Sequence, residues 1–327
     1  MAAHASQRAL VFDSGALIPE SWCRLAGDGP IRVFNPGLVQ DKNGWLLAYR
    51  VVLPDMARRI ALCRLNQALQ VVRGSQLPLS DFLCFRGEST YPETTRTWFA
   101  DPRLFRLAGR LFLYWNSGWH EGYNQQFLQE LDATHLLPIG FPRALHLLGE
   151  RQHIEKNWTL FGGGPFYAVY SVTPHHVLHV ALDGSRDIAC AALVCQAWDI
   201  TGYAERFGHL RGGAPPHLVD GSYYSFCHSV FGTPGAYRYV PAVYRFSACY
   251  PFQPTHAPLC PLELANPFGA TTLYARLNPA VGEVVYPCGA VYDEGRWIVS
   301  YGINDEHAAI AVLSQSAVCN TLSAVAY

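Results

Sequence analysis

Five recurring positions along the chain include residue types that can hold a polar ligand and move a proton. They are the first residues of a repeated segment, in chain order Asn35, Asp101, Asn157, Ala214 and Cys288. Asp101 is the carboxylate of this set, and Arg50, Arg103 and Lys156 flank the same row. A carboxylate among amides and cations can exchange a proton with a bound hydroxyl, while the cations hold an anionic group. The pattern therefore predicts a polar ligand site with an acid–base residue.

The last positions of the same segments form a second row of aromatic or imidazole side chains. In chain order these are Tyr49, Tyr114, Tyr170, His228 and Tyr301. Polar groups that converge on an aromatic-lined concave site suit a sugar. Asn and Asp also form Asx turns, so Asn35 and Asn157 alone would fit a turn equally well. Arg211 and Asp305 flank the row as well, and they favour a ligand site.

Each repeated segment has the pattern of a β-hairpin. The first and last positions are 13 or 14 residues apart, with apolar strands on either side of a short turn. The turns fall at Asn43-Gly44, Ala108-Gly109, Gly163-Gly164, Asp220-Gly221 and Glu294-Gly295, where glycine permits a tight reversal. The intervals between segments leave room for two more strands, and apolar runs such as 60–65 and 177–182 would supply them.

Four strands per unit, repeated radially, are typical of a β-propeller. We therefore expect an all-β fold, a five-bladed β-propeller formed as a single domain by residues 1–327. Its inner-strand hairpins would lie near residues 35–49, 101–114, 157–170, 214–228 and 288–301. Because the innermost strands line the central channel, their first residues would meet at one end of the axis.

Composition excludes several classes of protein. The chain has 24 Lys plus Arg against 25 Asp plus Glu, so it has no basic surplus for nucleic-acid binding. With 50% hydrophobic and 15% charged residues it is not disordered. No window has the roughly 18 apolar residues of a membrane span, and residues 1–20 do not resemble a signal peptide. Ten cysteines without a regular framework suggest mostly buried free thiols, and we expect a cytoplasmic protein.

The residues of these rows resemble glycoside hydrolase family 130, the inverting mannoside phosphorylases and mannosidases, and the related family 108 glycosyltransferases. The resemblance covers roughly residues 30–315. Its motifs are Phe34-Asn35-Pro36-Gly37, Tyr49-Arg50, Ala100-Asp101-Pro102-Arg103, Lys156-Asn157, Tyr286-Pro287-Cys288-Gly289-Ala290-Val291 and Tyr301-Gly302 with Asp305. One such motif is weak, but several of them in family order along the chain are fairly specific.

The resemblance implies roles for individual residues. Asp101 matches the general acid, and Asn35, Arg50 and Asp305 match groups that hold the sugar at the cleaved position. Further substrate contacts are expected from Arg103, Asn157 and Tyr301. The phosphate of a donor or product would be met by Lys156, Arg211, His228 and His175. We expect no metal and no organic cofactor, because the histidines at 175, 176 and 179 lack an acidic partner beside them.

Departures from the family bear on the type of reaction. Ala100 stands where the family usually has Glu, and the phosphate-binding arginines expected near 115–120 and 171–175 are missing. An inverting hydrolase needs a second carboxylate as base, which Glu155, Asp305 or Glu306 could supply. The pattern favours inverting glycosyl transfer, of a mannosyl unit, from a sugar-phosphate or nucleotide-sugar donor to a carbohydrate. A phosphorylase or hydrolase acting on β-mannosides and a non-catalytic sugar-binding propeller remain alternatives.

Overall fold

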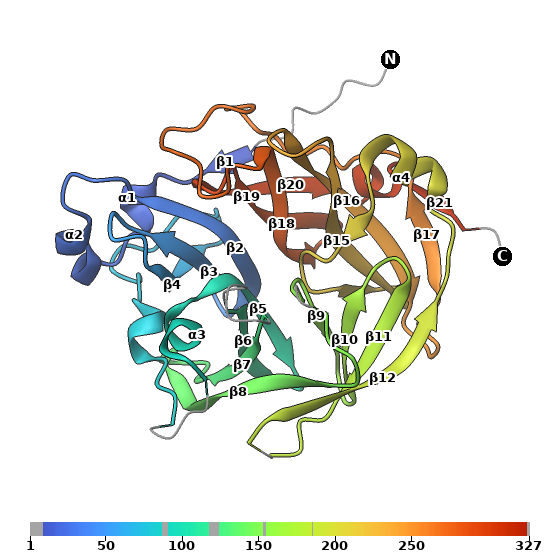
Figure 1. Cartoon of the computed structure of the whole chain (residues 1–327), viewed down its shortest axis with the longest axis horizontal. Helices are drawn as coiled ribbons and strands as arrows, with labels where there is room; N and C mark the ends of the chain where they lie inside the picture. The colour runs from blue at the N-terminus through green and yellow to red at the C-terminus, as the bar shows by residue number, and fades with distance from the viewer. Residues whose placement is uncertain (1–8, 87–90, 118–123, 153–154, 185, 326–327) are drawn as a thin grey trace.

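The computed structural model describes residues 9–86, 91–117, 124–152, 155–184 and 186–325. Strands dominate these residues, so the expected all-β class is confirmed. Figure 1 shows the strands in successive groups around a common centre. The helical segments are short: α1 (Ser14–Leu17), α2 (Glu20–Ala26), η1 (Leu79–Phe82), α3 (Glu93–Thr97), α4 (Thr201–Phe207) and α5 (Gln315–Cys319).

The first half of the chain forms two sheets. The first is antiparallel and consists of β2 (Arg32–Asp41), β3 (Gly44–Val52) and β4 (Arg58–Asn66). The second contains two antiparallel groups: β5 (Ala100–Leu107), β6 (Arg110–Asn116), β7 (Gln126–Leu131) and β8 (Pro138–Leu148), then β9 (Thr159–Gly162), β10 (Phe166–Ser171), β11 (His175–Val180) and β12 (Ile188–Gln196). Parallel pairing of β8 with β12 joins the two groups.

The second half forms one sheet that also contains two groups. The first group is β13 (Leu210–Arg211), β14 (His217–Val219), β15 (Ser222–Phe231), β16 (Tyr237–Ser247), β17 (Pro254–Pro258) and β21 (Leu322–Ala324). The second is β18 (Val281–Asp293), β19 (Arg296–Ile303), β20 (His307–Ser314) and β1 (Ala9–Val11). Parallel pairing of β16 with β18 joins them. Because β1 pairs with β20, a strand from near the N-terminus completes the last group.

The five expected hairpins are confirmed. They are β2–β3, β5–β6, β9–β10, β14–β15 and β18–β19, each antiparallel. Three of their turns have positive φ at both central residues: 49° and 76° at Ala108-Gly109, 47° and 73° at Asp220-Gly221, and 46° and 80° at Glu294-Gly295. Two successive left-handed residues make a type I′ turn, whose twist matches that of the strands.

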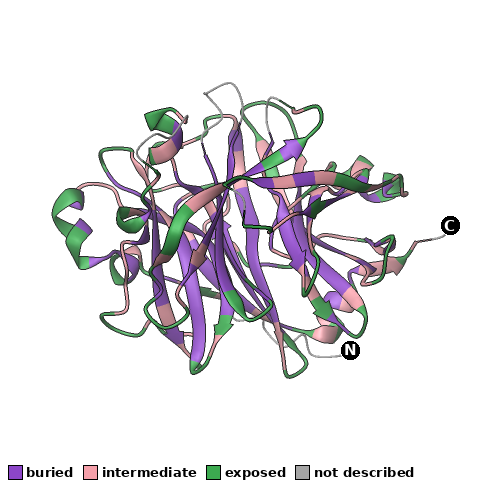
Figure 2. Cartoon of the chain, turned by 90° about the horizontal axis from the view of Figure 1, so that it is seen from below, coloured by how far each residue is buried: buried purple, intermediate pink, exposed green. Residues whose placement is uncertain are grey.

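Apolar side chains fill the spaces between neighbouring groups of strands. Trp45 and Tyr49 of the first group share one cluster with Ile298 and Ile310 of the last. Figure 2 shows buried residues along the strands and exposed ones mostly on the connections. The inner strands also approach closely, since a Cβ at Gly37 would lie 2.8 Å from the Pro102 carbonyl oxygen. This packing fixes β2, β5 and β18 relative to one another, and with them the residues of the repeated rows.

Two further observations concern the described residues. None of their helices has the length and apolar character needed to cross a membrane. The ten cysteines are free thiols, but four of them, Cys23, Cys84, Cys195 and Cys249, are exposed, so the expectation of mostly buried thiols is only partly met.

Candidate functional site

Three first positions of the repeat share an unusual backbone conformation. The φ angles of Asn35, Asp101 and Asn157 are 51°, 51° and 65°. Asn and Asp tolerate this left-handed region better than other L-residues, and such strained positions gather at functional sites. The other two first positions, Ala214 and Cys288, are buried and serve packing. The conformation thus separates the three polar positions of the row from the two apolar ones.

Asp101 is held by two side chains from the adjacent sheet. Asn35 Nδ2 donates a hydrogen bond of 2.7 Å to Asp101 Oδ1, and Arg50 Nη1 lies 3.5 Å from the same oxygen. The side chains of Arg50 and Asp101 are each 13% exposed. The first two members of the row, Asn35 and Asp101, are therefore in direct contact. Gly302 on β19 makes room, because a Cβ there would overlap Asn35 Oδ1.

The charges around Asp101 and Asp305 shift their pKa values in opposite directions. Burial opposes ionisation of Asp101, but Arg50, Lys156, Arg103 and the bond from Asn35 outweigh it, so its pKa lies below the ordinary value. Burial raises the pKa of Asp305, and the negative charge of Asp101 adds to this, although Arg50 and Lys156 oppose it. Two carboxylates near the same cations with opposed shifts are typical of an acid–base pair.

The other two candidate bases hold loops in place. Glu306 is buried and accepts hydrogen bonds from the backbone N–H groups of Leu273, at 2.7 Å, and Tyr274, at 2.9 Å. Glu155 is buried too, 3.1 Å from both Arg151 Nε and the Tyr170 hydroxyl. Both carboxylates are thus engaged in structural contacts, which leaves Asp305 as the second carboxylate of the site.

Arg103 makes several contacts within the protein. It is buried, with Nε donating to the Gly213 carbonyl and Nη2 donating to the Tyr286 hydroxyl. The Tyr286 hydroxyl in turn donates to Asn157 Oδ1 at 2.7 Å, and Arg103 Nη2 lies 3.4 Å from that oxygen. Arg103 therefore connects four groups of strands and positions Asn157, and its expected contact with a substrate stays a prediction.

Tyr301 is also placed differently from the expectation. Its ring is buried in an apolar cluster, and its hydroxyl donates to the Ala265 carbonyl oxygen at 2.9 Å. The side chain therefore anchors residues 262–266 to β19, and this contact replaces the expected one with a sugar.

His228, Lys156 and Arg211 lie close enough to one another to interact electrostatically, and Lys156 also acts on Asp101 and Asp305. The His228 ring is buried, stacked on Tyr239 with centroids 5.1 Å apart and edge-on to Tyr286 at 4.8 Å. Burial, with Arg211 and Lys156 nearby, lowers the pKa of His228 to about 3. The imidazole is therefore neutral at physiological pH, so it can donate one hydrogen bond and accept another but adds no positive charge.

His175 lies elsewhere, which corrects its expected role at the phosphate. Its ring is fully buried, 5.0 Å from the ring of Phe246 and 5.8 Å from that of Tyr244. Burial lowers its pKa to about 4, with a smaller contribution from His176 in the same direction. The residue is part of the packing between β11 and β16, where a phosphate could not reach it without disrupting the core.

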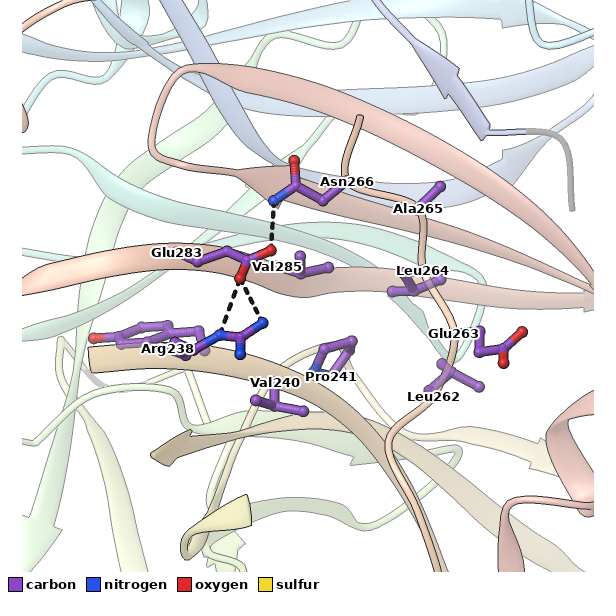
Figure 3. A pocket seen from close by; sticks show the side chains of 11 residues that line it. Arg238, Val240, Pro241, Leu262, Glu263, Leu264, Ala265, Asn266, Glu283 and Val285 are labelled. Atoms are coloured by element: carbon purple, nitrogen blue, oxygen red, sulfur yellow. Dashed lines mark hydrogen bonds and ion pairs between the residues drawn. The ribbon is translucent and has the colours of Figure 1, made fainter. Parts of the chain in front are cut away.

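A cavity of about 450 Å³ opens beside this side of the site, between β16, β18 and residues 262–266. Figure 3 shows Glu283 on the wall of the cavity between Arg238 and Asn266; it pairs with Arg238 Nη2 at 2.6 Å and accepts from Asn266 Nδ2 at 3.0 Å. Tyr239 lines the cavity and also stacks on His228, so it connects the cavity to the charged residues. Tyr239 and Tyr286 were not predicted, because neither belongs to the two rows of the repeat.

Two expectations concern metal ligands and the phosphate-binding arginines of the family. Within the described residues, no group of three or more His, Cys, Asp or Glu side chains is arranged to hold a metal ion. The stretch 115–120, where an arginine was expected from the family, lies partly outside the described residues.

Comparison with known proteins identifies the fold. No protein-family model and no curated protein matches the sequence. Among solved structures, a β-1,2-mannobiose phosphorylase from Listeria innocua is 14% identical, with a TM-score of 0.64 over 96% of this chain and 99% of that one. A second structure comes from work on the glycoside hydrolases, within family 130 of mannoside phosphorylases, that target β-1,2-mannosidic linkages in Candida mannan. It is 14% identical, with a TM-score of 0.61 over 88% of this chain and 85% of that one.

A mannose phosphorylase from Leishmania mexicana, solved with a phosphate ion, is 13% identical (TM-score 0.50, 90% and 87% covered). The chain therefore has the fold of enzymes that act on mannosides. More particularly, it has the fold of the family 130 mannoside phosphorylases, and the resemblance drawn from its sequence motifs is confirmed at the level of the fold.

Proposed function

We propose that this chain is a carbohydrate-active enzyme that transfers a mannosyl unit, with inversion, from a phosphate-activated donor to a carbohydrate acceptor. In this proposal the five groups of strands are the blades of a single propeller, with the site at one end of its axis. The observation that carries the proposal is the cluster of Asn35, Arg50, Asp101 and Asp305, in which two carboxylates share the same cations.

The lowered pKa of Asp101 supports transfer of the mannosyl unit to the acceptor, because this direction needs a base. An ionised carboxylate is ready to accept a proton, directly or through a hydroxyl of the sugar. As the acceptor oxygen forms its bond to the anomeric carbon, its proton passes to Asp101. The bond from that carbon to the phosphate oxygen breaks, and the electron pair leaves with the phosphate. Asp305, whose pKa is raised, would hold a proton more readily and donate a hydrogen bond to the sugar.

The same residues would serve phosphorolysis in the reverse direction, where a protonated Asp101 acts as general acid on the leaving oxygen. The fold shared with the Listeria phosphorylase supports this second candidate. A sugar-binding protein without catalysis is less well supported. Two neighbouring carboxylates in a largely buried site repel each other, and a site used only for binding gains nothing from the opposed pKa values.

The cavity beside Tyr239 is our candidate for the acceptor. Its volume of about 450 Å³ is within the range of small-molecule sites. Arg238, Glu283 and Asn266 offer hydrogen-bonding groups along its wall, and Tyr239 offers an aromatic face. An acceptor sugar placed there would approach the site from the side of His228.

A donor screen tests the proposal. The purified protein would be incubated with GDP-mannose, mannose 1-phosphate and a panel of mannosides as acceptors, and products would be followed by mass spectrometry. Turnover of a nucleotide sugar alone would support a transferase. Turnover of the sugar phosphate that reverses on addition of phosphate would identify a phosphorylase. Binding of a sugar without turnover of any donor would contradict the proposal and favour the sugar-binding alternative.

A further inference from the structure

Three arginines lie on one face of the first sheet. The register pairs Arg32 of β2 with Val52 of β3, and Val52 with Arg58 of β4. Arg50 precedes Val52 by two residues on β3. Since side chains alternate along a strand and directly paired residues share a face, Arg32, Arg50 and Arg58 all project to the same side, with Arg50 diagonal to the other two.

The protein partners of Arg32 and Arg58 are neutral. Arg32 Nη2 donates to the Ala275 carbonyl oxygen at 2.8 Å, and its guanidinium lies 4.9 Å from the Tyr274 ring centre. Arg58 Nη1 donates to the Met56 carbonyl oxygen, and its guanidinium lies 4.2 Å from the Trp98 ring centre. Carbonyls and aromatic faces orient a guanidinium without neutralising its charge. The two groups are thus held in place with their charge uncompensated by these contacts.

Arg50 adds a third charge and connects this face to the site. Its Nη1 lies 3.5 Å from Asp101, and its guanidinium lies 5.0 Å from the Phe34 ring centre. The Nε atoms of Arg32, Arg50 and Arg58 are all buried without a hydrogen-bond partner among the described residues. Arg32 as a whole is only 4% exposed. Unsatisfied buried donors are costly and rare in proteins, so three of them on one face require an explanation.

The charges of this face do not balance within the described residues. Burial, together with the positive charges of Arg50 and Arg32, lowers the pKa of Arg58 to about 10, and the carboxylate of Asp305 opposes this shift. Arg276 and Lys156 also act on Asp305. The two carboxylates of the site, Asp101 and Asp305, thus face more positive charge than they can neutralise. A bound anion would offset the repulsion among the guanidinium groups.

We propose that Arg32, Arg50 and Arg58 form a binding site for a phosphoryl group, either inorganic phosphate or the phosphate of a phosphate ester. The planar guanidinium matches phosphate oxygens in pairs, and an anion between three of them would gain charge-assisted hydrogen bonds. This site would extend the proposed function. That the phosphoryl group belongs to a mannosyl donor, or to the product of transfer, rests on the proposed function. The donor phosphate would then lie against the first sheet and not beside Arg211 and His228.

Arg59 provides a matched control for this site. It is the next residue on β4, so it projects from the opposite face, where Nη1 donates to Asp55 Oδ1 at 2.9 Å. Replacing Arg59 by Gln removes one positive charge from the same strand without touching the proposed site. Arg58→Gln removes the charge from the site, and since Arg58 is partly exposed the variant should fold.

The test is isothermal titration calorimetry with inorganic phosphate and, separately, mannose 1-phosphate, on the wild type, Arg58→Gln, Arg59→Gln and Lys156→Gln. Circular dichroism would check that each variant is folded. We expect phosphate to bind the wild type, and Arg58→Gln to weaken binding by about 10-fold or more, the scale of one charge-assisted hydrogen bond. Arg59→Gln should bind within about twofold of the wild type. Tighter binding of the ester than of free phosphate would mark it as the ligand.

Three outcomes would overturn the site: no phosphate or ester binding by the wild type at millimolar concentration, unchanged binding in folded Arg58→Gln, or loss in Lys156→Gln alone. The last outcome would place the phosphate beside His228 instead. The experiment needs no turnover, so the two proposals can fail separately. Phosphate binding that depends on Arg58, in a protein that turns over no mannosyl donor, would uphold the site and refute the proposed function.

Discussion

Replacement of Asp101 by Asn changes the charge at the centre of the site with little change in shape. The carboxylate accepts the 2.7 Å bond from Asn35 and faces Arg50 at 3.5 Å, and both interactions favour its ionised form. An amide can keep a hydrogen bond to Asn35 but cannot accept a proton at neutral pH. Loss of an acid–base residue lowers rates by about 10²–10⁴-fold. We expect Asp101→Asn to lower kcat by at least about 100-fold.

Asp101→Asn should also lower the free energy of unfolding, but not enough to unfold the protein. Removing the carboxylate leaves the positive charge of Arg50 without its partner, which costs about 3–5 kcal/mol for a fully buried pair. Arg50 and Asp101 each keep 13% exposure, so solvent screens part of this. We therefore expect a loss of about 1–3 kcal/mol in the free energy of unfolding, which a domain with typical stability of about 5–15 kcal/mol survives.

The assay compares initial rates of the wild type, Asp101→Asn and the exposed control Asp132→Asn, with the free energy of unfolding measured in urea. A β-mannoside with an activated aryl leaving group adds a second readout, because such a group departs without protonation. If Asp101 acts as general acid in cleavage, this substrate should restore most of the lost rate in the presence of phosphate. Wild-type kcat in a folded Asp101→Asn variant would refute the assigned role.

Three further predictions follow from the structure. Gly302→Ala should displace Asn35 and lower kcat by about 10-fold or more. The control Gly163→Ala should keep the wild-type kcat, because nothing lies within 4 Å of a Cβ there, and equal kcat values in the two variants would contradict the proposed packing. Tyr239→Ala should raise KM for the acceptor more than for the donor, and an equal rise in both would argue against the acceptor cavity. Burial depresses the pKa of His228 to about 3 and of His175 to about 4, so the unfolded state binds more protons below pH ~6.5 and stability should fall as the pH drops from there. At pH 5 each of these two histidines should cost about 2 kcal/mol in urea unfolding relative to pH 8, and a folded His175→Gln variant should lose about 2 kcal/mol less than the wild type over this range; a pH-independent free energy would contradict both shifts.

The repeat could be found in the sequence because its signals are local. A Gly turn between two apolar strands predicts a hairpin, and equal spacing predicts that equivalent residues share a place in every unit. This was enough to bring Asn35 and Asp101 together and to place Arg50 beside them. The opposed pKa values of Asp101 and Asp305 could not be predicted, because they depend on how many charges and apolar groups surround each carboxylate in space.

The errors have an equally physical origin. The register of β5 and β6 shifts between Ala100 and Arg103, so alternation along the strand cannot tell which way Arg103 points. His175 begins an outer strand, and its position in the sequence does not reveal that β11 packs against β16. The pairing of β1 with β20 joins segments about 300 residues apart, which no local pattern records.

The stereochemical course of the reaction tests the central claim most directly. The purified protein would be given an α-configured mannosyl donor, GDP-mannose or mannose 1-phosphate, with a mannoside acceptor, and the anomeric proton of the product would be followed by NMR. We predict a β-mannosidic product formed by the wild type and not by Asp101→Asn. An α-linked product, or equal formation by Asp101→Asn, would contradict inverting mannosyl transfer at this site.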